Sequence, residues 1–209
     1  MMDAAAVLQQ GLHTLSITLT AEKQKRLLAF GQLLLKWNRV YNLTSVRLPE
    51  EVLSRHLLDA LSVLPHLQGI RRLADVGSGG GLPGIPLAVA CPEMHVTSIE
   101  TVNKKASFQM QARIELGLEN LEVLNTRVEQ ITGVEPFDGI ISRAFSSLAD
   151  FVALAGSLAG MDGRLYAMKG IYPADEIAAL PAGWKVAEEI MLEVPGLDAE
   201  RHLIVLVRA

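Results

Sequence analysis

The residues best suited to chemistry lie in a glycine-dense loop that follows a short apolar strand. The stretch reads Leu73-Ala74-Asp75-Val76-Gly77-Ser78-Gly79-Gly80-Gly81-Leu82-Pro83-Gly84. Glycine lets a backbone turn tightly and leaves room for a ligand where a Cβ would clash. Pro83 suits the first turn of a helix, and the apolar residues after it predict one. A strand, a glycine loop and a helix in this order form a cradle for a nucleotide-type cofactor.

The glycine pattern has two phases, which predict different cofactors. From Gly79 it is Gly-x-Gly-x-x-Gly, the dinucleotide fingerprint of a nicotinamide-dependent oxidoreductase. That fingerprint places its first glycine at the strand end, whereas Gly79 lies beyond it. From Gly77 the pattern is Gly-x-Gly-x-Gly with an acid two residues earlier, and it resembles motif I of class I S-adenosylmethionine-dependent methyltransferases. This phase fits better and predicts cofactor contacts at Asp75, Gly77, Ser78 and Gly79.

A second acid supports a nucleoside cofactor. Residues 95–100 read as the next strand, which ends in Glu100, 23 residues after Gly77. A carboxylate near this spacing can accept hydrogen bonds from both ribose hydroxyls. Taken alone, Glu100 could equally be a solvated carboxylate at a strand end. The order of loop, helix, strand and acid nevertheless predicts that Glu100 contacts the cofactor.

The composition is typical of a globular protein. Half of the 209 residues are apolar and a fifth are charged, which is enough for one α/β domain with a full core. The single cysteine, Cys91, excludes an internal disulfide and a cysteine-rich metal site, and we expect no metal. We find no charged-then-apolar leader and no long uncharged apolar run, so we expect neither secretion nor a membrane span. The expected compartment is the cytoplasm.

The net charge of −4 is spread unevenly along the chain. Residues 21–72 hold nine Lys/Arg against four Asp/Glu, while residues 73–209 hold ten Lys/Arg against eighteen Asp/Glu. A basic N-terminal segment followed by an acidic remainder of the chain is expected where the N-terminal segment contacts phosphate groups. Long helices with lysine on their solvent face would produce the same distribution.

The segment before residue 70 predicts helices joined by a polar connector. Leucine and phenylalanine recur at helical spacing over residues 20–38, and Thr20 is placed to cap that helix. Residues 49–60 predict a second helix with a proline in its first turn. Residues 37–47, between them, are polar and aromatic. We therefore expect an N-terminal helical extension over residues 1–69 that packs on the core.

Strand and helix patterns alternate after residue 70. Strands are expected near 71–76, 95–100, 121–125, 138–142, 164–168, 185–192 and 202–208, and helices near 83–91, 103–117, 146–159 and 173–180. This alternation predicts a mostly parallel sheet with helices on both faces. No helix separates the last two strands, so the last strand should be antiparallel. The prediction is an α/β, Rossmann-like class I methyltransferase core with seven strands over residues 70–209, in one structural domain with the extension.

Several further stretches matter together with the glycine loop. They are Trp37-Asn38, Asn42-Leu43-Thr44-Ser45-Val46-Arg47, Arg55-His56-Leu57-Leu58-Asp59-Ala60, Ile141-Ser142-Arg143-Ala144-Phe145 and Met168-Lys169-Gly170. With the loop they resemble the RsmG family, also called GidB, over nearly the whole chain. The resemblance implies a bacterial enzyme that methylates N7 of a specific guanine in the decoding-region loop of 16S rRNA, with S-adenosylmethionine as cofactor. Its partner would be the rRNA, the small subunit or an assembly intermediate, and we expect a monomer.

The resemblance also implies individual contacts. The family's cofactor contacts fall on Gly77 and Leu82, on Val128 and Glu129, and on Arg143. One stretch departs from the family pattern, which often has Lys-Arg after the second strand. Here Lys104 keeps the charge, but the next residue is a lysine, which lacks the planar fork of arginine.

Basic residues in or near these motifs are candidate RNA contacts, because neutralised phosphates supply most non-specific affinity. They are Arg39, Arg47, Arg55, His56, Lys104, Arg127 and Lys169. Arg143 and Lys169 are also candidates for positioning the substrate. Ordinary ion pairs are the alternative; Arg55 and Asp59, for example, are four apart on one predicted helix.

No catalytic residue stands out, and the implied reaction requires none. Guanine N7 has an exposed lone pair, so positioning and desolvation are sufficient without a general base. The Asn-Pro-Pro-aromatic motif that suggests amine methylation is missing after the fourth strand. One alternative is a methyltransferase for a small molecule, but it would leave the basic N-terminal segment unexplained. Another is a non-catalytic RNA-binding protein.

Overall fold

A seven-stranded sheet with the order β3-β2-β1-β4-β5-β7-β6 crosses the molecule, and the computed structural model describes residues 3–143, 145 and 147–209. The strands are β1 (Arg72–Val76), β2 (His95–Ile99), β3 (Leu121–Leu124), β4 (Phe137–Ser142), β5 (Ala159–Lys169), β6 (Trp184–Met191) and β7 (His202–Arg208). The first five strands pair in parallel, and β7 runs antiparallel to both β5 and β6. The predicted α/β sheet is therefore confirmed, including its antiparallel last strand.

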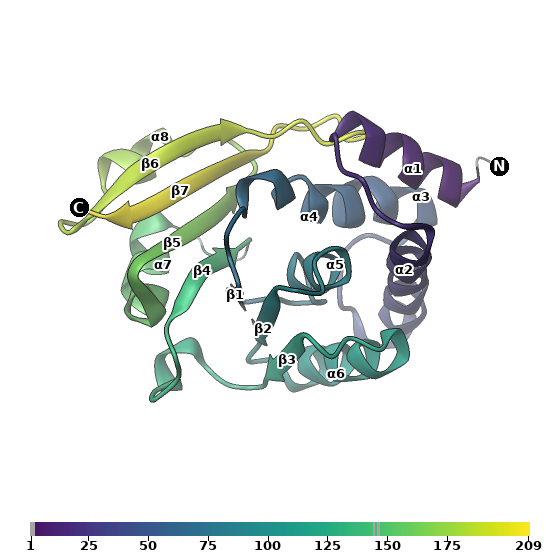
Figure 1. Ribbon diagram of the computed structural model, residues 1–209, viewed down its shortest axis with the longest axis horizontal. Helices are drawn as coiled ribbons and strands as arrows, with labels where there is room; N and C mark the ends of the chain where they lie inside the picture. The colour runs from purple at the N-terminus through teal and green to yellow at the C-terminus, as the bar shows by residue number, and fades with distance from the viewer. Residues whose placement is uncertain (1–2, 144, 146) are drawn as a thin grey trace.

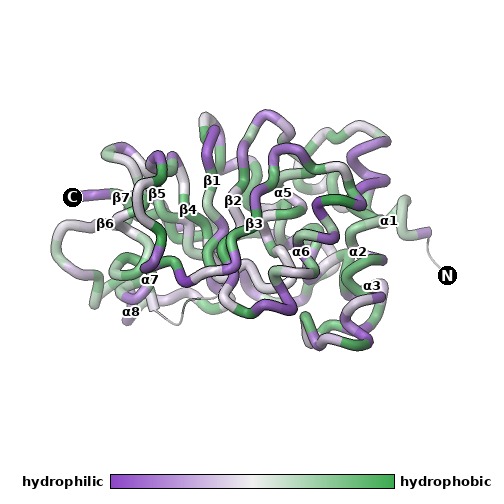
Figure 2. The backbone as a smooth tube through the Cα atoms, turned by 90° about the horizontal axis from the view of Figure 1, so that it is seen from below, coloured by the Kyte–Doolittle hydropathy of each residue, from purple (hydrophilic) through white to green (hydrophobic). Residues whose placement is uncertain are grey.

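The helices form layers on both faces of this sheet (Figure 1). They are α1 (Ala4–Thr14), α2 (Ala21–Tyr41), α3 (Pro49–Val52), α4 (Asp59–Leu61), α5 (Gly84–Ala90), α6 (Asn103–Leu116), α7 (Leu148–Ala155) and α8 (Ala174–Ala178). Helices α7 and α8 cover one face, while α5, α6 and the N-terminal helices cover the other (Figures 1 and 2). No helix within the described ranges is long and apolar enough to cross a membrane.

Alternating side chains of the strands divide the interior into two cores. In β1, Leu73 belongs to the core under the N-terminal helices and Ala74 to the core under α7. The same alternation separates Ile141 from Ile140 in β4 and Val205 from Ile204 in β7. Successive side chains of a strand point to opposite faces, so each strand contributes to both layers.

The N-terminal extension shares the first of these cores with the sheet. Helix α2 begins where predicted, because the Thr20 hydroxyl accepts a hydrogen bond from the Lys23 backbone N–H at 3.3 Å. Its apolar face buries Leu27 and Phe30, and the Phe30 ring lies 6.2 Å from that of Phe108 in α6. The Lys23 ammonium donates to the Ala90 carbonyl at the end of α5, at 2.8 Å. The extension is thus packed on the core by apolar and polar contacts.

Two predictions for the helical segments need correction. Helix α1 was not predicted, although Asp3 caps it and Leu8 and Leu12, one turn apart, are buried against the core. The predicted helix 49–60 is not regular, because a π-helix over Leu53–Leu58 joins α3 to α4. A π-helix holds more residues per turn, so side chains beyond it are rotated relative to an α-helix.

The predicted helix 146–159 is wrong at its C-terminal end, while its first residue lies outside the described residues. The helix ends at Ala155, a 3₁₀ turn covers Gly156–Leu158, and β5 begins at Ala159 instead of residue 164. At Gly156 a Cβ would lie 2.8 Å from the Trp184 ring, so only glycine allows this close packing. Strand β5 starts earlier because Ala159 pairs with Phe137 before the ladder shifts register.

Asn120 joins three parts of the core just before β3. Its side-chain amide donates to the carbonyls of Ala88, Cys91 and Met94 at 3.0, 3.1 and 3.0 Å. These carbonyls belong to the end of α5 and to the turn that leads into β2. One side chain therefore holds the helix end that follows the glycine loop.

We predict that Asn120→Ala destabilises the fold by about 1–3 kcal/mol, because it removes three hydrogen bonds to partly buried carbonyls. Urea unfolding followed by circular dichroism would measure this loss. The exposed neighbour Glu119 supplies the control, since Glu119→Ala should change stability by less than about 0.5 kcal/mol. Equal stability of the two variants would contradict the proposed role of Asn120.

Candidate functional site

The glycine loop at the end of β1 adopts conformations that favour glycine. Gly77, Gly79 and Gly81 have φ angles of +71°, +58° and +79°. A Cβ at Gly84 would lie 2.8 Å from the Asp75 carboxylate, so glycine is also required where α5 begins. At Gly79, by contrast, a Cβ would meet only the Gly77 carbonyl, at 4.0 Å. The loop is therefore tightly packed on its protein side and open above Gly79.

Gln109 in α6 holds this loop from below and was missed in the sequence. Its amide nitrogen donates to the Ser78 hydroxyl at 2.7 Å and to the Gly79 carbonyl at 2.8 Å. The residue is fully buried. A polar residue midway between Ala106 and Ala112, on the buried face of a helix, was the available signal. Gln109 thus fixes two of the loop residues that were predicted to contact the cofactor.

Glu100 lies at the end of β2, beside the loop. One carboxylate oxygen accepts from the Gly79 N–H and the other from the Val102 N–H, both at 2.7 Å. Each carboxylate oxygen has a second lone pair, so these bonds leave acceptor capacity for hydroxyl groups. The side chain is 5% exposed, which orients it firmly at the rim of the cradle.

Asp75 lies beneath the loop and is fully buried. Its Oδ2 accepts from the Gly84 N–H at 2.7 Å, while its Oδ1 has no partner among the described residues. Burial raises the pKa of Asp75 to about 7, although the Gly84 hydrogen bond and the Arg143 charge oppose this shift. In this position Asp75 ties the start of α5 to the end of β1.

The other predicted cofactor residues lie along the same edge of the sheet. Leu82 is buried in the loop, and Val128 is buried in a short 3₁₀ turn, Val128–Gln130, after β3. Glu129, in the same turn, is exposed. Arg143 follows β4, next to Ser142, whose hydroxyl donates to the Val76 carbonyl at 2.7 Å. The carboxyl ends of β1, β2, β3 and β4 thus lie next to one another at one edge of the sheet, and the crevice outside such strand ends is the usual ligand position in these sheets.

This arrangement fits S-adenosylmethionine. The left-handed glycines leave the loop open above Gly79, and the buried Gln109 holds its shape. Glu100 stands where ribose hydroxyls would meet an acceptor. The Oε1 atom of Gln109 is buried beneath the loop and has no partner among the described residues.

A basic cavity of about 340 Å³ adjoins the crevice beyond Arg143. Its lining comes from the N-terminal extension, from the end of β5 and from the residue before β7. Its charged and titratable side chains are those of Arg55, His56, Arg143, Lys169 and Arg201. The structure therefore brings together four predicted substrate or RNA residues, and it adds Arg201, which lies in none of the sequence motifs.

Asp59 connects the two arginines of this cavity. Its fully buried carboxylate accepts from Arg143 at 2.9 Å and from Arg201 at 2.8 Å, through different oxygens. Arg55 does not pair with Asp59, as the helical spacing suggested, but with Glu51 at 3.2 Å. The π-helix between them accounts for this change.

Lys169, at the end of β5, lies near the same cavity with an ion pair of its own. Its ammonium lies 2.7 Å from the Glu176 carboxylate and donates to the Phe145 carbonyl at 3.2 Å. The Phe145 ring stacks on that of Phe151 at 5.1 Å, so this aromatic contributes to packing.

His56 is held in a single tautomer at the wall of the cavity. Its Nδ1 lies 2.8 Å from the Arg55 carbonyl, so this nitrogen is the donor, and Nε2 accepts from the Thr44 hydroxyl at 2.8 Å. Burial, helped by the Arg143 charge, lowers the pKa of His56 to about 4. The imidazole is therefore neutral at pH 7. The connector that carries Thr44 is fixed in turn by Asn38, which bonds the Thr44 N–H and the Val46 carbonyl.

Four predicted RNA contacts do not line this cavity. Arg39 and Arg47 are exposed on the extension, and Arg47 lies 3.4 Å from the Asn42 side chain. Lys104, in the first turn of α6, and Arg127, after β3, are also exposed. Their role as RNA contacts stays a prediction.

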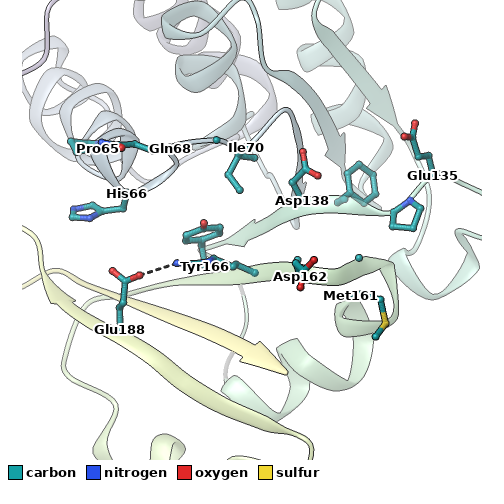
Figure 3. Close-up of a pocket in the computed structure, with 16 residues that line it drawn as sticks. Pro65, His66, Gln68, Ile70, Glu135, Asp138, Met161, Asp162, Tyr166 and Glu188 are labelled. Carbon is teal, nitrogen blue, oxygen red and sulfur yellow. Dashed lines mark hydrogen bonds and ion pairs between the residues drawn. The ribbon is translucent and has the colours of Figure 1, made fainter. Parts of the chain in front are cut away.

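A larger cavity, of about 800 Å³, lies at the opposite edge of the sheet, where β4 and β5 begin (Figure 3). Its polar groups support local structure. Asp138 accepts from the backbone N–H groups of Arg71 and Arg72, both at 2.9 Å, and Glu188 pairs with Arg164 at 2.9 Å. Because ligands of parallel sheets bind at the carboxyl ends of the strands, the crevice near Arg143 is the candidate site.

The sheet order, the glycine loop after β1 and the acid after β2 define a class I S-adenosylmethionine-dependent methyltransferase. A solved O-methyltransferase, TomG from Streptomyces achromogenes in complex with SAM, shares this fold with a TM-score of 0.60, at 15% identity and with full coverage of both chains.

The chain belongs to the GidB family, described as rRNA small subunit methyltransferase G, whose model matches residues 23–204. A relative named ribosomal RNA small subunit methyltransferase G, from Azoarcus sp. (strain BH72), is 62% identical over 98% of this chain and 96% of its own. A relative of the same name from Pseudomonas aeruginosa (strain LESB58) is 49% identical over 96% and 94%.

We predict that Gln109→Leu weakens binding of S-adenosylmethionine roughly threefold to thirtyfold, because the loop loses two buried hydrogen bonds. Titration calorimetry would measure the dissociation constant. Gln111→Leu is the matched control on the same helix, since Gln111 bonds only the exposed Glu115, and binding should be unchanged. Wild-type affinity in both variants would show that the loop holds its shape without Gln109.

The lowered pKa of His56 predicts a specific dependence of stability on pH. Between about pH 4 and 6.5 the unfolded chain binds a proton at this histidine and the folded chain does not, so acidification favours unfolding. Relative to His56→Gln, the wild type should therefore lose about 2–3 kcal/mol between pH 7 and 4.5. The opposite contribution of Asp75 is common to both proteins and cancels in the difference.

Urea unfolding of both proteins at the two pH values would measure this effect. The exposed His13 supplies the control, because His13→Gln should follow the wild type at both. A constant difference between wild type and His56→Gln would mean that His56 titrates normally in the folded protein.

Proposed function

We propose that this protein transfers a methyl group from S-adenosylmethionine to N7 of a specific guanine in the decoding-region loop of 16S rRNA. Membership of the family and the names of its relatives support the substrate. The observation in the structure that carries the proposal is the basic cavity lined by Arg143, which follows β4 at the edge of the sheet that also carries the glycine loop. A site for a small neutral molecule would need no such concentration of arginine and lysine, whereas RNA brings phosphate groups to it.

Arg143 links the two halves of the proposed site. It follows β4 beside the cofactor crevice, and its guanidinium also lines the basic cavity. Arginine can bind either a carboxylate or a phosphate group through its planar fork. A residue in this position can therefore hold the two reactants at a fixed distance from each other.

The side chains around the crevice suit a reaction without a general base. S-adenosylmethionine supplies, when bound, an electrophilic methyl group on its sulfonium. His56 is neutral, but both of its ring nitrogens are engaged with Thr44 and the Arg55 carbonyl. Asp75 is buried beneath the loop and held by Gly84. What the protein contributes is orientation and removal of water, which are sufficient for a lone pair as exposed as that of guanine N7.

We infer that the substrate is the small ribosomal subunit or one of its assembly intermediates. The family name refers to the rRNA of this subunit, which bacteria assemble in the cytoplasm. A monomer of this size presents the cavity and the exposed Arg39 and Arg47 to such a particle without a second copy of the chain.

The test is methyl transfer from labelled S-adenosylmethionine to small subunits that lack the modification, with the product mapped by cleavage at N7-methylguanine. We predict one modified guanine, in the decoding-region loop, and no transfer to large subunits. Transfer to several unrelated guanines would contradict the specificity. Cofactor binding without transfer would favour a small-molecule substrate, and failure to bind the cofactor would favour the oxidoreductase interpretation of the loop.

A further inference from the structure

The charged groups around the basic cavity do not balance. Arg55 pairs with Glu51 and Lys169 with Glu176, so each has its own carboxylate. Arg143 and Arg201, by contrast, share the single carboxylate of Asp59. Among the described residues, the ion pairs at this cavity therefore join four cations to three carboxylates. The surplus positive charge belongs to the two arginines that share Asp59.

Both arginines are partly removed from water, which makes the surplus charge costly. Their side chains are 32% and 22% exposed, while Asp59 is completely buried. A partly buried charge without a counter-ion is unfavourable, and a bound anion would relieve it. The pair of arginines around Asp59 therefore favours a bound anion.

The two guanidinium groups have donors left for such an anion. Arg143 uses NH1 for Asp59 and, at 3.5 Å, for the Arg55 carbonyl. Arg201 uses Nε for Asp59 and NH1 for the Glu200 carbonyl at 2.7 Å. A guanidinium carries five N–H groups, so within the described part of the chain Arg143 keeps Nε and NH2 and Arg201 keeps NH2. Both residues line the cavity.

We propose that Asp59 is a positioning residue whose shared ion pairs fix Arg143 and Arg201 as a two-arginine site for one oxyanion of the reactants. This inference rests on the proposed function, because the reaction offers two such groups. One is a phosphodiester of the RNA and the other is the carboxylate of S-adenosylmethionine. Asp59 touches neither and acts only through the arginines.

The position of Asp59 explains how one carboxylate serves both arginines. Arg143 follows β4 and Arg201 precedes β7, so they come from separate strands of the sheet. Asp59 begins α4 in the N-terminal extension and reaches both with different oxygens. A carboxylate in this bridging position sets the separation and the direction of the two guanidinium groups, which two independent pairs could not do.

The experiment compares Asp59→Asn, Arg201→Gln and the double variant with the wild type in the methylation assay on unmodified small subunits. Asp59→Asn keeps the shape of the side chain and removes its charge. We expect kcat/KM to fall at least about tenfold in each single variant. Because Asp59 acts through Arg201, the double variant should lose much less than the product of the two single losses. Glu22→Gln, which breaks the exposed Arg26 pair, is the control and should match the wild type.

Two further measurements identify the oxyanion. If it is an RNA phosphate, Arg201→Gln lowers the slope of log affinity for the subunit against log salt by about one and leaves cofactor affinity unchanged. If it is the cofactor carboxylate, the dissociation constant of S-adenosylmethionine rises about tenfold or more and the salt slope is unchanged. Arg201→Lys keeps the charge, so it should restore the salt slope but only part of the activity.

The proposal is overturned if folded Arg201→Gln keeps wild-type kcat/KM, salt slope and cofactor affinity. It is also overturned if the losses of the two single variants multiply in the double variant. Arg201→Gln leaves the Asp59–Arg143 pair intact, so the test holds even if Asp59→Asn fails to fold. A wild type that methylates no subunit would contradict the proposed function instead, which separates the two failures.

Discussion

The buried carboxylate of Asp59 is the interaction on which the site depends. It is the point where the N-terminal extension meets the ends of β4 and β7, through Arg143 and Arg201. Removing Asp59 would leave two partly buried arginines without the carboxylate that they share, which is unfavourable. The extension is therefore not merely attached to the methyltransferase sheet, because it carries the carboxylate that orders the arginines of the sheet.

A second set of buried polar contacts shapes the cofactor side of the crevice. Asp75 holds the start of α5, Gln109 holds the floor of the glycine loop, and Glu100 holds the Gly79 N–H at its rim. Each approaches from a different element, β1, α6 or the end of β2. The loop has left-handed glycines and little stiffness of its own, so these contacts determine its shape. Pre-organisation on this scale reduces the ordering needed when a ligand binds.

The sheet and the glycine loop were predictable because their signals are local. Strand alternation and the spacing from Gly77 to Glu100 depend only on neighbouring residues. The arrangement around Asp59 was not predictable, because it joins residue 59 to the distant residues 143 and 201. It also depends on a π-helix that no local sequence pattern indicated. Helical spacing instead suggested an Arg55–Asp59 pair. Gln109 shows the intermediate case, in which a polar residue on a buried helix face indicates importance without naming its partner.

The two edges of the sheet differ in the charge of the side chains that line their cavities. The net charge is −4, yet the cavity at the carboxyl ends of the strands is lined by arginine and lysine. The cavity at the opposite edge is lined by Glu135, Asp138, Asp162 and Glu188, with Arg164 already paired. A polyanion approaching such a molecule is repelled from one edge and attracted to the other. The carboxyl edge of the sheet, where we propose the cofactor contacts, is thus also the edge that the charge distribution makes attractive to a polyanion such as RNA.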